Sequence, residues 1–406
     1  MKRAVRRLVV VALLWPGPWG AALGQPFIYV TNKHSNSLSV INDATHQIAA
    51  TIGVGDSPSG VAVSPDGAVV YVANSSNNSN SVSVIDAHTN KAVTTIKVGA
   101  APLGVALSPN GAVAYVSNAN ANTVSVIDTQ TRKVTATVDV GVMPSGLAVT
   151  PNGRLVYVAN VQDLNNPHEG DVSVIDTSTN TVVDAIPTGS NPFAVAIAPD
   201  GRTVYVANSN TLMFKGPGTI AVIDASRGAV RTTIPVGDNP LGLALTADGH
   251  TLLATNFNSD TVSVIATATD TVTTTVPVGK GPLGVALTAD GRVAYVANRQ
   301  PFGKAAAGDV SVIDVEHWSV VATVPVGENP TSVGAMPAPI ESVPCPGDCN
   351  EDGMVTVDEL IVGTTIALGV APLSACPSFD VDGDGGVAVT ELVAAVGDAL
   401  RGCPGS

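Results

Sequence analysis

Two acidic segments near the end of the chain have the residue pattern of a calcium-binding loop. The pattern is Asp-x-[Asp/Asn]-x-[Asp/Asn]-Gly followed by five residues and Glu. Carboxylate, amide and carbonyl oxygens at these positions converge on one hard cation, and the glycine allows the sharp bend. The predicted ligands are Asp348, Asn350, Asp352, the carbonyl of Met354 and Glu359 in the first loop, and Asp380, Asp382, Asp384, the carbonyl of Gly386 and Glu391 in the second. We therefore expect two Ca²⁺ ions as cofactors.

An apolar helix is predicted after each loop, over residues 359–371 and 391–401, and prolines precede both loops. Two loops, each followed but not preceded by a helix, resemble a dockerin type I module, an EF-hand-type calcium fold. The resemblance covers residues 347–406, and residues 338–346 form a proline-rich linker before it. It implies a protein partner of the cohesin type on a cell surface.

The first 24 residues are typical of a secretory signal peptide. A basic stretch from Met1 to Arg7 precedes an apolar core and a small-residue cleavage region ending at Gly24. The apolar core is too short to span a bilayer, and no later stretch of the sequence is suitable. We expect a secreted, periplasmic or surface-exposed protein, and a monomer. The net charge of −14 argues against nucleic acid as a partner.

Export also bears on the cysteines, all of which lie near the C-terminus: Cys345, Cys349, Cys376 and Cys403. In an oxidising compartment, four cysteines in a small module predict two disulfides, with three possible pairings. We favour a bond from Cys403 to Cys345 or Cys349, because it would join the ends of the module.

The larger part of the chain, residues 25–337, is a repeat. Seven times, at intervals of 42 to 48 residues, a phrase such as Val70–Asn74 returns with a second phrase of the type Ser83–Asp86. Each unit contains four short strands of period two, with a Ser-Pro-Asp-Gly turn such as Ser64–Gly67 after the first and a turn capped by an aspartate such as Asp86 after the third. This period and strand content predict an all-β propeller with seven four-stranded blades.

The two ends of the repeat region predict how the propeller closes. The region begins on a second-type strand, residues 27–31, and ends on a lone first-type strand, residues 330–334. Pairing of these two strands in one blade would remove the free sheet edges. An open solenoid would instead need capping units at both ends.

The Tyr-Val-Ala-Asn phrase followed by Ser-Val-Ile-Asp resembles the YVTN (YncE-like) family of β-propeller repeats. The resemblance implies a bacterial or archaeal surface or periplasmic propeller, with lactonase-like and lyase-like relatives. Its repeated residues are structural and imply no catalytic site. Leu253 and Ala266 depart from the pattern in the sixth repeat.

Function is expected where the loops between second and third strands and those between fourth and first strands meet. The residue after each repeated proline should line the channel mouth, an uncharged ring of Ser59, Leu103, Ser145, Phe193, Leu241, Leu283 and Thr331. Charged residues expected on this face are Lys33, His34, Asp56, His168, Glu169, Lys215, Asp238, Lys280, Arg299 and Glu328. From these two sets we take His34, Arg299, Glu328 and Phe193 as the candidate ligand face, with scattered surface charge as the alternative.

The ring lacks the histidines and carboxylates that acid–base or metal chemistry needs, so we assign no catalytic residue. The sequence thus favours an exported, calcium-binding scaffold that binds a ligand or partner and is not an enzyme. The alternative is a propeller hydrolase or lyase that acts on a lactone or a polysaccharide-derived substrate.

Overall fold

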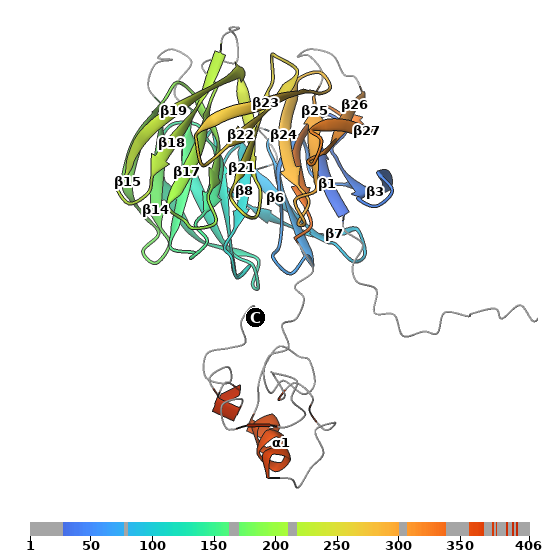
Figure 1. Ribbon diagram of the computed structural model, residues 1–406, viewed down its shortest axis with the longest axis vertical. Helices are drawn as coiled ribbons and strands as arrows, with labels where there is room; N and C mark the ends of the chain where they lie inside the picture. The colour runs from blue at the N-terminus through green and yellow to red at the C-terminus, as the bar shows by residue number, and fades with distance from the viewer. Residues whose placement is uncertain are drawn as a thin grey trace, which may run out of the picture.

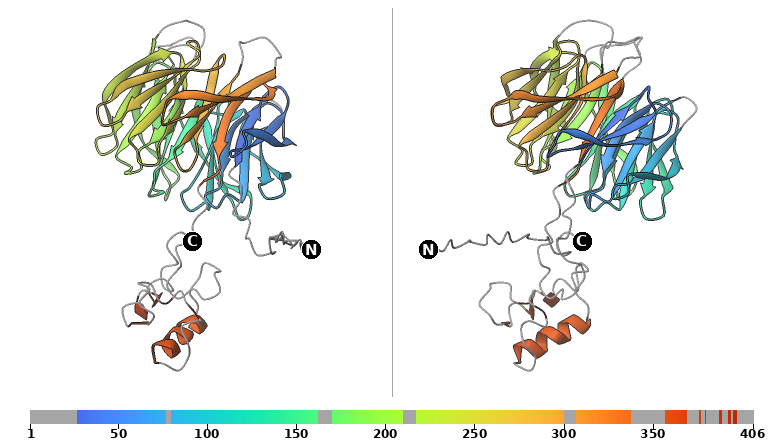
Figure 2. Two further views of the ribbon diagram at one scale, coloured as in Figure 1. Left: turned by 45° about the vertical axis from the view of Figure 1, so that its right-hand side comes forward. Right: turned by 90° about the vertical axis from the view of Figure 1, so that its right-hand side faces the viewer.

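Seven four-stranded antiparallel sheets form the main body of the protein. The computed structural model describes residues 27–76, 80–161, 170–209, 217–299 and 307–337, then 357–368, 376, 379, 387–388, 392–393 and 395–396. Figures 1 and 2 show the sheets side by side around one axis, in the order of the chain. The seven-bladed all-β propeller predicted from the repeat is confirmed.

Each blade contains one strand of each repeat type, numbered here from the blade that holds both ends of the ring. Blade one contains β28 (Pro330–Ala335), β1 (Phe27–Asn32), β2 (Ser37–Asn42) and β3 (Gln47–Gly53). Blades two to four contain β4 (Pro58–Val63), β5 (Val69–Asn74), β6 (Ser81–Asp86), β7 (Lys91–Lys97); β8 (Pro102–Leu107), β9 (Val113–Asn118), β10 (Thr123–Asp128), β11 (Lys133–Asp139); and β12 (Pro144–Val149), β13 (Leu155–Asn160), β14 (Gly170–Asp176), β15 (Thr181–Gly189). Blades five to seven contain β16 (Pro192–Ile197), β17 (Thr203–Asn208), β18 (Pro217–Asp224), β19 (Ala229–Asp238); β20 (Pro240–Leu245), β21 (Thr251–Asn256), β22 (Thr261–Ala266), β23 (Thr271–Pro277); and β24 (Pro282–Leu287), β25 (Val293–Asn298), β26 (Ala307–Asp314), β27 (Ser319–Glu328).

Blade one closes the ring as predicted. Strand β28 pairs with β1 in antiparallel register, with Ile28 opposite Ala335 and Val30 opposite Val333. In Figure 1 the blue strand β1 therefore lies beside the orange strands from the end of the repeat region. Pairing satisfies the backbone groups of both strands and leaves no unpaired first-type strand in the described propeller.

The turn between first and second strands follows from its sequence. In blade two, the Gly67 amide donates to the Ser64 carbonyl at 2.8 Å, and Gly67 has a φ of 71°. A left-handed φ of this kind suits glycine, and the preceding Asp66 accepts from the Ala68 amide at 2.9 Å. This turn lies on the face opposite the channel mouth, where it joins each first strand to the second strand of the same blade.

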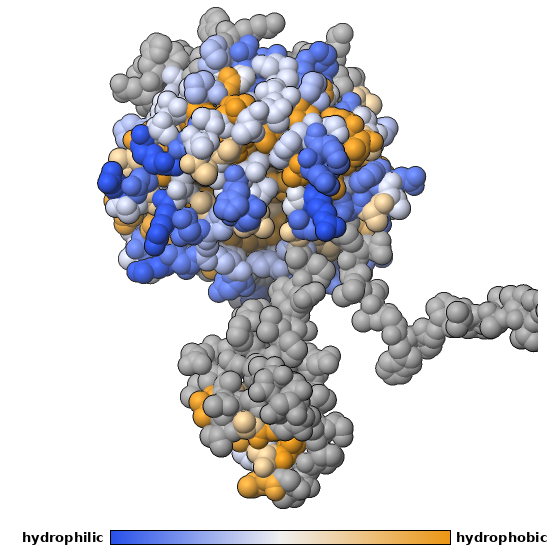
Figure 3. All heavy atoms as spheres, viewed as in Figure 1, coloured by the Kyte–Doolittle hydropathy of each residue, from blue (hydrophilic) through white to orange (hydrophobic). Residues whose placement is uncertain are grey.

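The core lies between the blades. Second and third strands are almost fully buried, whereas fourth strands are exposed along most of their length. Valines exposed on the fourth strands, such as Val183 and Val321, lie in different blades. Figure 3 accordingly shows hydrophobic and hydrophilic residues interspersed over the side of the propeller.

Tyrosines of the second strands contact the next blade. The hydroxyl of Tyr295 in blade seven lies 2.9 Å from Nδ1 of His46 in blade one and donates to Asp43 at 2.6 Å. In blade six this tyrosine is replaced by Leu253, and Trp318 of blade seven packs against the same core cluster. The departure at Leu253 is therefore filled by a larger residue in the neighbouring blade.

In the C-terminal region the described residues contain one helix, α1 (Val357–Ala367), which overlaps the first predicted helix. Residues 392–393 and 395–396, within the second predicted helix, are also helical, and the rest of that range lies outside the described residues. Cys376 and Phe379 are fully buried beside residues of α1. The predicted calcium-binding α module is thus not shown, and this part of the fold prediction stays a prediction. No described helix is long and apolar enough to cross a membrane.

Candidate functional site

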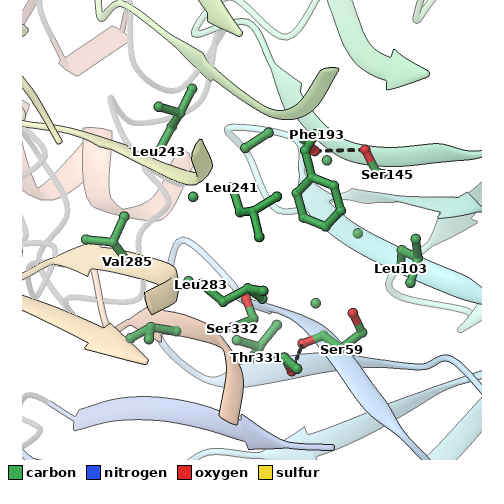
Figure 4. Close-up of a pocket in the computed structure, with 18 of the residues that line it drawn as sticks. Ser59, Leu103, Ser145, Phe193, Leu241, Leu243, Leu283, Val285, Thr331 and Ser332 are labelled. Atoms are coloured by element: carbon green, nitrogen blue, oxygen red, sulfur yellow. Dashed lines mark hydrogen bonds between the residues drawn. The ribbon is translucent and has the colours of Figure 1, made fainter. Parts of the chain in front are cut away.

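The seven first strands enclose a cavity of about 280 Å³ at the axis of the propeller. All seven residues of the predicted channel-mouth ring line it, together with the residues that follow them in each strand. Figure 4 shows the Phe193 ring extending into the space between Leu241 and Leu103. The cavity lining carries no ionisable side chain. It can therefore hold a small apolar or neutral group but offers no acid–base pair.

Two hydroxyls of the ring are used by the scaffold. Ser145 Oγ donates to the Phe193 carbonyl at 2.8 Å, and Thr331 Oγ1 donates to the Pro58 carbonyl at 3.2 Å. Both residues are buried, and each bond joins one blade to the next. The bond from Ser145 is visible in Figure 4. The hydroxyls of Ser59 and Ser332 remain as partly exposed polar groups of the lining.

Glycine follows the ring residue in five blades because neighbouring first strands approach each other closely. A Cβ on Gly60 would lie 2.4 Å from the Leu103 carbonyl oxygen, and one on Gly242 would lie 2.1 Å from that of Leu283. Such contacts would push the strands apart. The glycines thus keep the cavity narrow.

A second ring, of asparagines, ends the second strands: Asn32, Asn74, Asn118, Asn160, Asn208, Asn256 and Asn298. These side chains are buried, and Nδ2 of Asn74, for example, donates to Ser81 and Ser83 Oγ at 3.0 Å each. The repetition in every blade indicates a structural role, as expected. The asparagine side chains link the second strands to hydroxyls of the third strands.

His34 and Glu328 of the candidate ligand face meet at the junction of blades seven and one. The His34 amide donates to the Glu328 carbonyl at 3.2 Å, and the Glu328 amide donates to Ser35 Oγ at 2.7 Å. The His34 ring also contacts the side-chain amide of Asn329. The two residues are therefore neighbours through their backbones, while Phe193 lies in the cavity wall of blade five.

Arg299 lies at the same junction, close to Lys33. Burial lowers the pKa of Lys33, and the positive charge of Arg299 lowers it further. Burial also lowers the pKa of the Arg299 guanidinium. The sequence placed both residues on this face, but only the closed ring makes them electrostatic neighbours.

Other charged candidates are engaged elsewhere or lie outside the described residues. Lys280 forms a salt bridge with Asp260, and Asp56 accepts from Asn36 Nδ2 at 3.2 Å. The Asp238 amide donates to Ser259 Oγ at 2.8 Å. His168, Glu169 and Lys215 lie outside the described residues.

The predicted calcium ligands also lie outside the described side chains, since of these only the backbone of Glu359 is placed. Among described residues, no group of three or more His, Cys, Asp or Glu is arranged to hold a metal. Cys376 is buried and is not a free thiol, but Cys345, Cys349 and Cys403 are not described. Both the calcium sites and the cysteine pairing stay predictions.

The sequence did not single out the fourth residue of each first strand. Val61, Leu147, Leu243, Val285 and Val333 line the cavity below the ring. Alternation along the strand would have identified them, because residues two apart share one side. Their apolar character extends the lining away from the mouth.

Comparison with known proteins supports the propeller fold. Residues 26–139 match the family described as "Lactonase, 7-bladed beta-propeller". Hydrazine synthase from Kuenenia stuttgartiensis is 23% identical with a TM-score of 0.63, over 72% of this chain and 93% of that one. A protein of unknown function from Desulfotomaculum acetoxidans DSM 771 is 16% identical with a TM-score of 0.63, over 77% of this chain and 99% of that one.

A third similar structure is dihydro-heme d1 dehydrogenase NirN in complex with DHE, which is 16% identical with a TM-score of 0.54. That match covers 76% of this chain and 75% of that one. At these identities the likeness concerns the fold. No curated protein sequence matches the chain.

Proposed function

We propose that the propeller is an exported binding protein whose channel mouth takes a small, largely apolar organic ligand. The observation that carries this proposal is the uncharged cavity of about 280 Å³, into which leucines, a phenylalanine and hydroxyls converge. Its size is near the lower end of the range for ligand pockets, roughly 300–1,000 Å³, and apolar walls with a few polar groups are usual there. Phe193 serves as the aromatic contact.

A neutral fluorescent probe, N-phenyl-1-naphthylamine, tests this function. We expect it to bind with one site per chain and enhanced emission. Phe193→Ala should weaken binding about tenfold, because it removes most of one aromatic contact surface. Val183→Ala, a change at an exposed fourth-strand valine, is the matched control and should bind like the wild type. Absence of saturable binding, or equal loss in both variants, would refute the proposal.

The match to the lactonase description favours a second candidate function, that of a hydrolase or lyase that acts on a lactone or a polysaccharide-derived substrate. In that function, Arg299 would polarise the carbonyl, with Glu328 and His34 nearby. Release of acid from δ-valerolactone in a pH-stat tests it. Turnover that is lost in both Arg299→Ala and Glu328→Ala would replace the binding function by catalysis.

For the C-terminal module we propose two bound Ca²⁺ ions and a role in attachment. The support is the two complete loop patterns, with acid clusters that repel each other unless cations are present. Isothermal titration of the chelator-treated protein should give two ions per chain, and one ion in the Asp382→Asn, Glu391→Gln variant. A pull-down from envelope extract, with and without chelator, tests whether a cohesin-like partner requires calcium.

Export itself is proposed from the leader and is tested by the N-terminus of the mature protein. Mass spectrometry of protein from the culture medium or periplasm should find Gln25 as the first residue. A cytoplasmic protein that retains Met1 would contradict this localisation.

A further inference from the structure

The residue after each ring asparagine occupies an equivalent place at the rim of the channel. In every blade its amide donates to the carbonyl of the residue before the first-strand proline, as from Lys33 to Asn329 at 3.0 Å and from Arg299 to Gly281 at 2.9 Å. The channel-mouth residue comes two positions after that carbonyl. We call these seven the rim residues: Lys33, Ser75, Ala119, Val161, Ser209, Phe257 and Arg299.

Charge breaks the symmetry of the rim in one sector. The five rim residues of blades two to six are uncharged, and four of them are buried, Phe257 among these. Lys33 and Arg299, in adjacent blades one and seven, are both cationic and partly buried. Residues that serve the scaffold recur in every blade, so a charge pair confined to one junction has another reason.

Two positive charges in neighbouring, partly buried positions raise the free energy of the protein. Each loses hydration, and Arg299 acts on Lys33 as a like charge. No salt bridge among the described residues includes Lys33. An anion bound beside Lys33 would offset its lost hydration and the repulsion from Arg299.

We propose that Lys33 and Arg299 form an anion subsite at the rim and that the ligand is an organic carboxylate whose apolar part lies in the cavity below. Thr331 and Leu283 are the channel-mouth residues of the same two blades, and each lies two positions after the carbonyl that accepts from the Lys33 or Arg299 amide. The arrangement matches a molecule with one charged end and an apolar body. This inference rests on the proposed binding function and adds the chemical class of the ligand.

A pair of probes with one aromatic body separates the two proposals. N-phenyl-1-naphthylamine is neutral, and 8-anilinonaphthalene-1-sulfonate carries a negative charge on the same framework. We expect the anionic probe to bind about tenfold more tightly to the wild type, which is the size expected for hydrogen bonds to partly exposed charged groups. Octanoate should displace it, and octanamide should be at least about fivefold weaker as a competitor.

Lys33→Met and Arg299→Met keep much of the apolar stem and remove the charge. Each should weaken the anionic probe about fivefold to tenfold, and the neutral probe should bind as before. Lys280→Met is the matched control, because Lys280 lies on the same face but is exposed and paired with Asp260. The Lys280→Met variant should bind both probes with the affinity of the wild type. If Arg299→Met does not fold, as judged by circular dichroism, Lys33→Met and Lys33→Gln decide the matter.

Three results are decisive. Loss of the preference for the anionic probe in Lys33→Met, with the neutral probe unaffected, supports the anion subsite. Equal affinity of the two probes for the wild type, or an equal effect of Lys280→Met, overturns it while the binding function stands. Failure of both probes to bind overturns the binding function, and with it this inference.

Discussion

Asn239 is a buried residue whose side chain has no hydrogen-bond partner among the described residues, although its backbone carbonyl accepts from the Phe257 amide. It lies before the first strand of blade six, is 1% exposed, and has a φ of 62°. Neither Nδ2 nor Oδ1 of its side chain is hydrogen-bonded within the part of the chain that the structure describes. The equivalent residue in blade seven is Gly281, which has the same φ of 62°. Asparagine adopts the positive φ that this position requires, but the described residues leave its side-chain amide without hydrogen bonds.

Replacing Asn239 by glycine should therefore stabilise the propeller. The change removes two unpaired buried polar atoms, a cost of about 1–3 kcal/mol, and adds unfolded-state entropy of about 0.5–1 kcal/mol. We expect the free energy of unfolding in urea to rise by about 1 kcal/mol. Asn329→Gly is the control, since Asn329 contacts the His34 ring and should gain nothing. A destabilised Asn239→Gly would show that the Asn239 side chain contributes favourably.

Aspartates in the turns between third and fourth strands bind backbone and hydroxyl donors. Thr131 donates to Asp128 Oδ1 from its amide and its hydroxyl, each at 2.7 Å. The hydrogen bond from the Thr131 amide is the main reason that the pKa of Asp128 lies below 3.8. Blade six has Ala266 at this position, with Thr269 placed like Thr131. The Thr269 amide donates instead to the Ala266 carbonyl at 3.4 Å, and its hydroxyl lies 2.8 Å from that of Thr271, so neither group has a carboxylate acceptor.

Ala266→Asp should supply that acceptor and raise the melting temperature at pH 7 by about one to three degrees. A lowered folded-state pKa gives stability that is present above 3.8 and is lost as the pH falls through the folded value. The gain should therefore disappear near pH 2. The same melting curves with Ala266→Asn serve as the control, because a neutral acceptor should show no such pH dependence. A gain that persists at pH 2 would argue against the carboxylate as its cause.

At the scale of elements, each second strand fits against a turn of the next blade. Trp318 has a φ of 50°, a conformation in which asparagine is common and tryptophan is not, and Asn90 and Asn180 occupy the equivalent turn positions. Trp318 packs beside Leu253, where the six other blades have a buried tyrosine. The two substitutions in blades six and seven compensate each other in volume.

A double-mutant cycle measures this compensation. Leu253→Tyr alone should destabilise the protein by about 1–3 kcal/mol, because the larger ring meets the indole. Trp318→Asn alone should also destabilise it, since it leaves space beside Leu253. The double variant should be more stable than the sum of the two changes predicts, by about 1 kcal/mol or more. Additive effects in urea unfolding would mean that the two side chains do not share one site.

At the scale of the whole molecule, the repeat was enough to predict the blades, their closure and the channel-mouth ring. Period-two alternation and turn residues place the strands, and β5 (Val69–Asn74) contains the repeated phrase Val70–Asn74. The sequence could not show that the Ser145 hydroxyl donates a hydrogen bond to the Phe193 carbonyl, because that bond joins different blades. It could not pair Lys33 with Arg299 either, because their proximity depends on closure over more than half the chain.

Closure also predicts how truncations behave. A chain that ends at Pro337 keeps β28, so it should unfold cooperatively near the wild-type melting temperature. A chain that ends at Glu328 lacks β28, which leaves β1 with an unpaired edge and exposes its neighbours in blades seven and two. We expect this shorter chain to aggregate or to lose its cooperative transition, as seen by circular dichroism and size-exclusion chromatography. Hydrogen exchange on the longer chain should protect the amides of Tyr29 and Val30, which lie opposite Gly334 and Val333. A soluble, cooperatively folded chain ending at Glu328 would show that the ring does not depend on this strand.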